Sequence, residues 1–260
     1  MSELKNLIKP EAHDPYHKYG IVPYLAAMSN QHIAFFEYMA KEGFDKYNKA
    51  DFLRKTIMKY SKDLFTRIKN EDQTLFANRN YMVAPNLTDE DIQNIVWKWQ
   101  GNVMEIIAGY MFMTCNPFND RYSFDEMCGD DKNDVGVDGW LRSTTNRNFF
   151  IGIQVKYRFE KEVKWNDQIT KALALTDERV RKLYQANQLT DQDWCIWGKQ
   201  IQRRAVLVTT TKLSDSVTNA IGTDAFDVID ETVLLEYIGK KNNVNPNKEF
   251  WETLFERIYK

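Results

Sequence analysis

An amide and an ammonium group stand two positions apart in residues 149–157, which read Phe-Phe-Ile-Gly-Ile-Gln-Val-Lys-Tyr. This segment is rich in β-branched and aromatic residues and carries no charge before Lys156, which predicts a largely buried strand. Since side chains alternate across a strand, Gln154 and Lys156 share one face, and the opposite face is wholly apolar. Burying a lysine without an anionic partner is costly, so Lys156 is expected to face an anion or a cleft that opens to water.

A carboxylate that can serve as this anion lies in the preceding segment, residues 134–141. Asp138 lies there between two glycines, which let another backbone or a ligand come close. The polar residues 144–148 that follow are typical of a turn, so the two segments are predicted to be adjacent strands. The chemical interpretation is a site built from Asp138, Gln154 and Lys156. The structural alternative is an ion pair of Asp138 with Lys156 that merely joins the strands.

A lone carboxylate, Glu105, lies in a long helix that is predicted over residues 89–114. Thr88 and Asp91 have the spacing of a capping box, with Asp in place of the usual Glu or Gln, and mark the start of this helix. Between residues 99 and 119 the only charged side chain is that of Glu105, which therefore needs a partner, a metal or a shifted pKa. A metal site and a salt bridge to a basic residue elsewhere both satisfy that need.

Basic side chains form one stripe of a second helix, which is predicted over residues 49–69. Lys55, Lys59 and Lys62 lie on this stripe, and apolar residues lie on another. Two interpretations are open: the solvated face of an amphipathic helix, and a surface that contacts the phosphates of a nucleic acid.

The length, charge and cysteine content of the chain limit the classes of protein to which such a site can belong. A length of 260 residues fits one large domain, or one domain with a helical extension. The net charge of −2 means that any nucleic-acid surface must be a local patch. Three cysteines without metal-like spacing indicate reduced residues in a reducing cytosol. We find no signal peptide and no apolar stretch long enough to span a membrane, so no membrane partner is expected.

The remaining segments predict an α/β protein with helices on both faces of a mixed sheet. Residues 116–134 are expected to form a polar loop that carries an acidic run. Strands are expected at 203–211 and 225–229. Further helices are expected at the following ranges: 24–42, 166–187, 214–222, 231–238 and 250–259.

A helix with a buried Glu, then Gly-Val-Asp-Gly, then an apolar strand ending Ile-Gln-Val-Lys resembles the PD-(D/E)xK nuclease superfamily. The Gln in place of an acidic residue is similar to the Mrr-like restriction endonuclease branch. The resemblance covers residues 88–240 and implies a restriction-endonuclease-like αβββαβ-type core, in which helices flank a mixed central sheet. Residues 1–87 are then an N-terminal helical extension for DNA binding or dimerisation, and residues 241–260 are a C-terminal helix.

The resemblance implies a role for each residue of the candidate site. Asp138 matches the central metal-binding carboxylate, Gln154 the third motif position, Lys156 the lysine of the family and Glu105 the acid on the helix. The implied Mg²⁺, for which Mn²⁺ can substitute, is held by Glu105, Asp138 and Gln154 with the carbonyl of Val155. The chain departs from the common pattern in having Val before Asp138 and Gln154 in place of Glu, which leaves open whether one or two metals bind.

The implied activity is Mg²⁺-dependent hydrolysis of DNA phosphodiester bonds by a restriction-type or phage or mobile-element endonuclease, in the cytoplasm of a bacterial or phage-infected cell. Lys156 would orient the attacking water and stabilise the transition state, and Arg158 would contact a neighbouring phosphate. Double-stranded DNA is the expected partner, and because double-strand cleavage commonly uses two active sites, the function points to a homodimer. The alternative is a non-catalytic nucleic-acid-binding or interaction module that keeps the nuclease fold. A helical adaptor built on residues 1–87 is a third interpretation.

Overall fold

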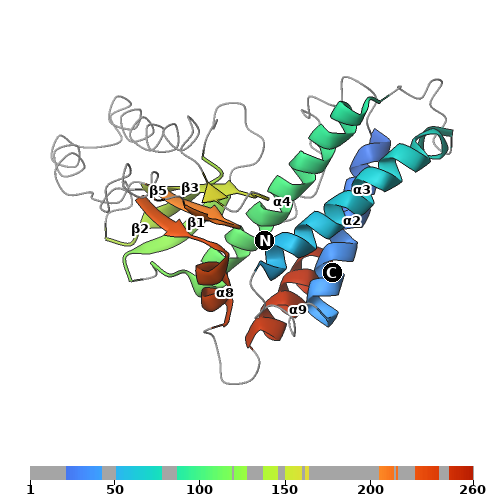
Figure 1. Ribbon diagram of the computed structural model, residues 1–260. Coiled ribbons are helices and arrows are strands. Elements are labelled where there is room, and N and C mark those ends of the chain that lie inside the picture. Colours follow the sequence, from blue (N-terminus) through green and yellow to red (C-terminus); the bar gives the residue numbers. More distant parts are fainter. Residues whose placement is uncertain are drawn as a thin grey trace, which may run out of the picture. The chain divides into compact units, whose positions relative to one another are not determined.

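The computed structural model describes the chain over these residues: 22–42, 51–77, 87–118, 120–127, 137–145, 150–159, 162–163, 205–213, 215, 226–239 and 246–259 (Figure 1). It divides into two compact units. One comprises residues 1–106 with 242–260, and the other comprises residues 107–241. The predicted boundary at residue 240 lies one residue from the edge of a unit, whereas the one at residue 87 lies inside the first unit, which continues to residue 106. The last helix belongs to the same unit as the first ones.

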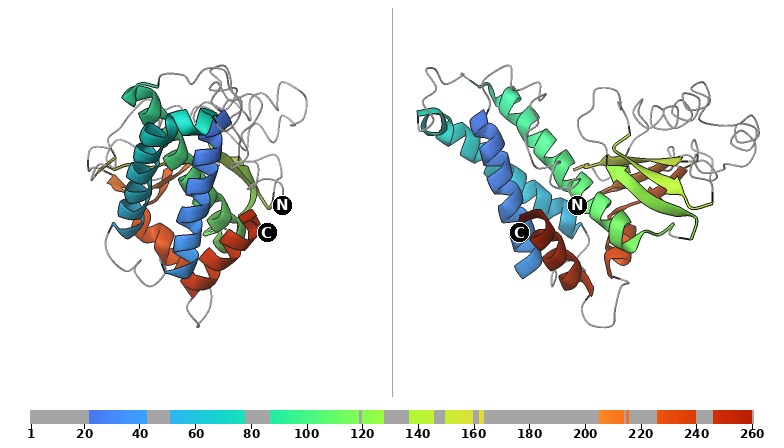
Figure 2. Two further views of the ribbon diagram at one scale, coloured as in Figure 1. Left: turned by 90° about the vertical axis from the view of Figure 1, so that its right-hand side faces the viewer. Right: turned by 180° about the vertical axis from the view of Figure 1, so that it is seen from behind.

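The first unit is helical. It contains α2 (Val22–Lys41), α3 (Phe52–Ala77), α9 (Pro246–Tyr259) and the first part of α4 (Asp89–Cys115). Helix α2 packs against both α3 and α9 (Figure 2). The buried rings of Phe35 and Trp99 meet edge to face, with centroids 6.1 Å apart, and a buried hydrogen bond of 2.8 Å runs from Gln100 Nε2 to Ser61 Oγ. Aromatic packing and a few satisfied polar groups hold the helices together.

The capping box at the start of α4 is confirmed. The backbone N–H of Thr88 donates to Asp91 Oδ2 at 2.9 Å, and the N–H of Asp91 donates to Thr88 Oγ1 at 3.2 Å. The hydrogen bond from the Thr88 hydroxyl is the main reason why the pKa of Asp91 lies below its ordinary value. Two N–H groups that the helix itself cannot satisfy are thus paired reciprocally, which fixes where α4 begins.

The second unit is built on a five-stranded mixed sheet in the order β1-β2-β3-β5-β7. Its strands are β1 (Tyr122–Met127), β2 (Gly139–Ser143), β3 (Phe150–Lys156), β5 (Ala205–Thr209) and β7 (Phe226–Ile229). Strands β1, β2 and β3 are antiparallel neighbours, whereas β3, β5 and β7 run parallel. Helix α8 (Glu231–Gly239) packs against β5 and β7, and the short strands β4 (Glu162–Val163) and β6 (Lys212–Leu213) form a separate parallel pair. The predicted α/β class with a mixed sheet and flanking helices is confirmed.

The expected polar loop at residues 116–134 is wrong in part, because it contains strand β1. Among the described strands it pairs with β2 alone and lies at the edge of the sheet, so it has no apolar run that marks a buried strand. A bidentate ion pair fixes it instead. Arg142 Nη2 and Nε reach the two carboxylate oxygens of Asp125 at 2.8 and 3.1 Å. Part of the acidic run thus has a structural role in pairing the edge strand.

Most other predicted elements are confirmed within a few residues wherever the structure describes them. The exception is the helix predicted over residues 49–69, because α3 runs on to Ala77 into the segment that was expected to be a connection. The helices predicted at 166–187 and 214–222 lie outside the described residues, apart from residue 215. Among the helices of the described part, none is long and apolar enough to cross a membrane.

Candidate active site

Asp138 and Gln154 meet across two adjacent antiparallel strands. The register pairs Gly139 with Ile153, so the next pair along the strands is Asp138 with Gln154. The N–H of Asp138 donates to the carbonyl oxygen of Ile153 at 2.7 Å, which extends the pairing past the end of β2. Paired residues project from the same face, so Asp138, Gln154 and Lys156 share one face of the sheet, as predicted.

One oxygen of the Asp138 carboxylate is held firmly. Gln154 Nε2 donates to Oδ2, and the backbone N–H of Val155 donates to the same atom at 2.5 Å. No described residue forms a hydrogen bond with the other oxygen, Oδ1. The carboxylate is therefore oriented by one of its oxygens, and the second oxygen has no hydrogen bond from the described residues.

The electrostatic environment of Asp138 is that of a buried acid. Burial raises the pKa of its carboxyl group above the ordinary value, and this effect exceeds three others that lower it. Those are the charge of Lys156, the N–H of Val155 and the amide of Gln154. The residue as a whole keeps some exposure, but its carboxyl group lies deep enough to lose most of its hydration. Because burial destabilises the charged form of this carboxyl group, a nearby cation is expected to stabilise it.

Lys156 lies on the same face, two residues beyond Gln154, and is half-buried. Its positive charge acts on Asp138, yet no direct ion pair joins Lys156 to a carboxylate of the described residues. By contrast, Arg142 forms a direct bidentate ion pair with Asp125. The structural alternative, in which Lys156 serves only as a cross-strand ion pair to Asp138, is not what the described residues form.

Gln154 brings a second free oxygen to this face. The residue is fully buried, with an exposed fraction of 0%, and its Oε1 has no hydrogen-bond partner in the described structure. Orphaned buried acceptors are rare in native proteins and call for a ligand or water. Asp138 Oδ1 and Gln154 Oε1 are both hard oxygen donors, of the kind that Mg²⁺ prefers, so these residues fit the implied metal.

Two of the predicted metal ligands are less defined. Val155 contributes its N–H to Asp138, and its carbonyl as a ligand stays a prediction. Glu105 is a half-buried residue of α4 in the helical unit, whereas Asp138 and Gln154 belong to the sheet unit. Its membership of the site therefore also stays a prediction. Within the described residues no group of three or more His, Cys, Asp or Glu side chains is placed to hold a metal, so the predicted site depends on amide and backbone oxygens beside Asp138.

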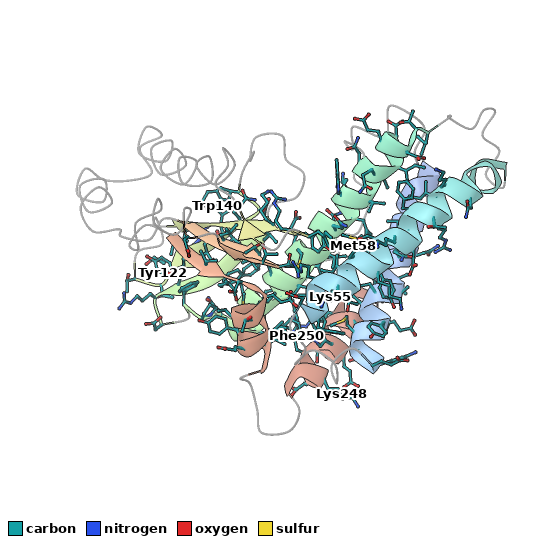
Figure 3. All side chains as sticks on the ribbon, viewed as in Figure 1. Lys55, Met58, Tyr122, Trp140, Lys248 and Phe250 are labelled. Atoms are coloured by element: carbon teal, nitrogen blue, oxygen red, sulfur yellow. The ribbon has the colours of Figure 1, made fainter. Side chains whose placement is uncertain are left out.

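Two buried side chains lie next to the candidate site in the sheet. Trp140, labelled in Figure 3, lies two residues past Asp138, opposite Gly152, and is 1% exposed. Thr209 is paired with Lys156 from the next strand, β5, and is 0% exposed. Sequence reasoning did not identify Thr209, because its place beside Lys156 depends on the register of two strands almost fifty residues apart. The one signal was the run of threonines that ends strand β5.

The predicted nucleic-acid contacts lie on both units. The backbone of Arg158 is fixed by Thr210, and its Nη1 donates to the carbonyl of Tyr157 at 3.1 Å. Lys55, labelled on α3 in Figure 3, lies 3.8 Å from Asp51, and Lys59 lies over two tyrosine rings. The exposed residue Lys62 makes no ion pair with a described residue. Its charge is therefore the least neutralised of the three predicted lysines.

Comparison with known proteins gives no match. No family model, no curated protein and no solved structure is significantly similar to this chain.

Proposed function

We propose that the protein is a Mg²⁺-dependent endonuclease that hydrolyses DNA phosphodiester bonds. The observation that carries this proposal is the pair of Asp138 and Gln154 beside Lys156. Each of the first two keeps one oxygen without a hydrogen bond from the described residues, and one of these oxygens is fully buried. A buried acid, a buried acceptor and an ammonium on one face are what a metal-assisted phosphoryl site requires.

Asp138 and Gln154 would hold the metal, and the resemblance implies Glu105 and the carbonyl of Val155 as further ligands. When bound, Mg²⁺ supplies Lewis acidity toward a phosphoryl oxygen and makes a bound water more acidic. The chain contributes orientation. Because Gln154 Nε2 and the N–H of Val155 both fix Oδ2, the carboxylate plane is set before any ligand arrives. Such preorganisation lowers the entropy lost on binding.

Lys156 would supply positive charge where negative charge develops on the phosphoryl group. It is half-buried and makes no direct ion pair among the described residues, so its ammonium group is available to a ligand. In a partly desolvated site an ammonium interacts more strongly with a phosphate than it does in water. In this proposal Lys156 also orients the attacking water through a hydrogen bond.

The topology of the sheet supports the restriction-endonuclease-like assignment. Helix α4 is followed by the three antiparallel strands β1, β2 and β3, and β5 then joins β3 in parallel. This order agrees with the described part of an αβββαβ-type core, and the segment in which its second helix is predicted lies outside the described residues. The carboxylate at the start of β2 and the Gln-Val-Lys of β3 occupy neighbouring positions, as the motif requires.

Double-stranded DNA is the proposed substrate, and a restriction-type or phage or mobile-element endonuclease is the proposed biological class. The exposed lysines of α3 are proposed to contact the phosphate backbone, with Lys62 contributing most. Cleavage of both strands would use two copies of the chain.

The test is a cleavage assay on plasmid, linear, methylated and branched DNA with Mg²⁺ or Mn²⁺, followed by mapping of the cut ends. We expect the wild-type protein to cut at least one of these substrates and Asp138→Ala and Lys156→Ala to lose the activity. Equal cleavage by both variants would refute the assignment of the site.

One observation favours the alternative of a non-catalytic DNA-binding module. The amide of Gln154 donates to Asp138, where many nucleases place a second acid, so the carboxylate is partly satisfied without a metal. This alternative predicts DNA binding without metal-dependent cleavage. The same assay, combined with a binding measurement in EDTA, separates the two functions.

A further inference from the structure

A buried hydroxyl group lies beside Lys156 on the face that carries the proposed site. In the parallel register of β3 and β5, Gln154 is paired with Leu207 and Lys156 with Thr209. Paired residues of neighbouring strands project from the same face, so Thr209 is the immediate neighbour of Lys156 on β5. Thr209 has an exposed fraction of 0%.

The hydroxyl of Thr209 has no hydrogen-bond partner in the described structure. A buried hydroxyl without a partner destabilises a fold, and a valine of the same shape would avoid that cost. The next residue shows the contrast. Thr210 Oγ1 accepts from the N–H of Arg158 at 2.9 Å and donates to its carbonyl oxygen at 2.8 Å. The hydroxyl of Thr210 therefore stabilises the fold through two hydrogen bonds, whereas the hydroxyl of Thr209 forms none.

Lys156, the neighbour of Thr209, carries a group that can donate a hydrogen bond to the hydroxyl. The ammonium group of Lys156 has three N–H donors, and no described residue accepts from it. A threonine oxygen offers two lone pairs, and Lys156 has a flexible side chain that can turn toward it. The register thus places a buried hydroxyl without a hydrogen-bond partner next to a residue whose ammonium group can donate to it.

We propose that Thr209 is a positioning residue of the site, whose hydroxyl oxygen accepts a hydrogen bond from the ammonium group of Lys156 in the substrate complex. This inference rests on the proposed endonuclease function. The hydroxyl directs the ammonium group toward Asp138 and the scissile phosphate. In the absence of substrate, the same hydroxyl is buried without a partner and lowers the stability of the fold. Residues of this kind commonly lower the stability of a protein while serving its activity.

The test compares Thr209→Val and Thr209→Ser in thermal unfolding and in steady-state cleavage. We expect Thr209→Val to raise Tm by about 2–4 °C, because it removes an unpaired hydroxyl. It should lower kcat about 10- to 100-fold, which corresponds to the loss of one hydrogen bond to a charged group, and leave KM unchanged. Thr209→Ser keeps the hydroxyl and loses a buried methyl group, so it should lower Tm and retain most of kcat.

Thr210→Val serves as the control for the stability measurement, because it removes a hydroxyl with two partners and should lower Tm. Unchanged kcat in Thr209→Val would overturn the inference while leaving the proposed function intact. A lower Tm together with a matching loss of kcat in both Thr209 variants would show a merely structural role and overturn it as well. If the wild-type protein itself cuts none of the DNA substrates, the proposed function fails, and the inference fails with it.

Discussion

Replacing Asp138 by Asn should make the protein more stable and less active. In Asp138→Asn the amide oxygen can take the place of Oδ2 and keep both hydrogen bonds, from Gln154 Nε2 and from the N–H of Val155. Hydrogen bonds to a charged acceptor contribute about 1.5–3 kcal/mol and those to a neutral one about 0.5–1.5 kcal/mol, so the variant loses about 2–3 kcal/mol over the two bonds. What it gains is relief from the desolvation of a buried carboxylate, a penalty of several kcal/mol.

The raised pKa of Asp138 decides the balance, because it shows that burial outweighs the hydrogen bonds and the charge of Lys156 together. We therefore expect Asp138→Asn to raise the free energy of unfolding at about pH 7 by about 1–2 kcal/mol, and Tm by about 2–8 °C.

The difference in stability between the variant and the wild-type protein depends on pH. The folded-state pKa lies above the unfolded value of about 3.9, so Asp138 favours folding below that value, and this contribution is lost as the pH rises through the folded pKa. The advantage of the variant should shrink toward about pH 4, because a larger fraction of the wild-type carboxyl groups is protonated there than at about pH 7.

Thermal unfolding in EDTA, followed by circular dichroism at both pH values, measures this effect. Asp125→Asn is the matched control, because Asp125 forms a bidentate ion pair with Arg142 and the substitution should lower Tm. Added Mg²⁺ or Mn²⁺ should raise the Tm of the wild-type protein and leave that of Asp138→Asn almost unchanged, since only a protein that binds the ion is stabilised by it. A lower Tm for Asp138→Asn in EDTA would instead show that the ionised carboxylate of Asp138 stabilises the fold, contrary to this prediction.

Three further predictions follow from the described contacts. Gln154→Glu places a second carboxylate against Asp138, so it should lower Tm in EDTA and increase the stabilisation by Mn²⁺; equal responses of variant and wild type to Mn²⁺ would contradict the metal assignment. Lys62→Ala should reduce the slope of log K against log salt for DNA binding by about 1, whereas the control Lys248→Ala on α9, which removes a lysine paired with Glu252, should not. Arg142→Ala should destabilise the protein by about 0.5–1 kcal/mol in urea unfolding, because the partner of the Asp125 carboxylate on the edge strand is lost; no change would show that the ion pair is dispensable.

The central part of the sheet could be predicted from the sequence because its signals are local. The alternation of residues in β3 placed Gln154 and Lys156 on one face, and the turn residues after β2 placed Asp138 beside them. The capping residues Thr88 and Asp91 likewise fixed the start of α4. Each of these inferences depends on residues that are close in the chain.

What the sequence did not reveal depends on distant partners. Strand β1 is polar because it lies at the edge of the sheet, and its ion pair to Arg142 joins residues seventeen positions apart. The position of Thr209 follows from the parallel register of β3 and β5, which no local pattern encodes. The packing of α9 against α2 joins helices that are about two hundred residues apart in the sequence. The orphaned oxygen of Gln154 also emerges only from three-dimensional packing, although it is the feature that best supports a ligand at this site.

The most direct test of the proposed active site is Mg²⁺-dependent cleavage of plasmid DNA by wild-type protein and Asp138→Asn, prepared in parallel and compared at a temperature where both are folded. We predict cleavage by the wild-type protein that EDTA abolishes, and none by the variant, even though the variant unfolds at the higher temperature. Cleavage by Asp138→Asn at the wild-type rate would contradict the claim that Asp138, Gln154 and Lys156 form the active site.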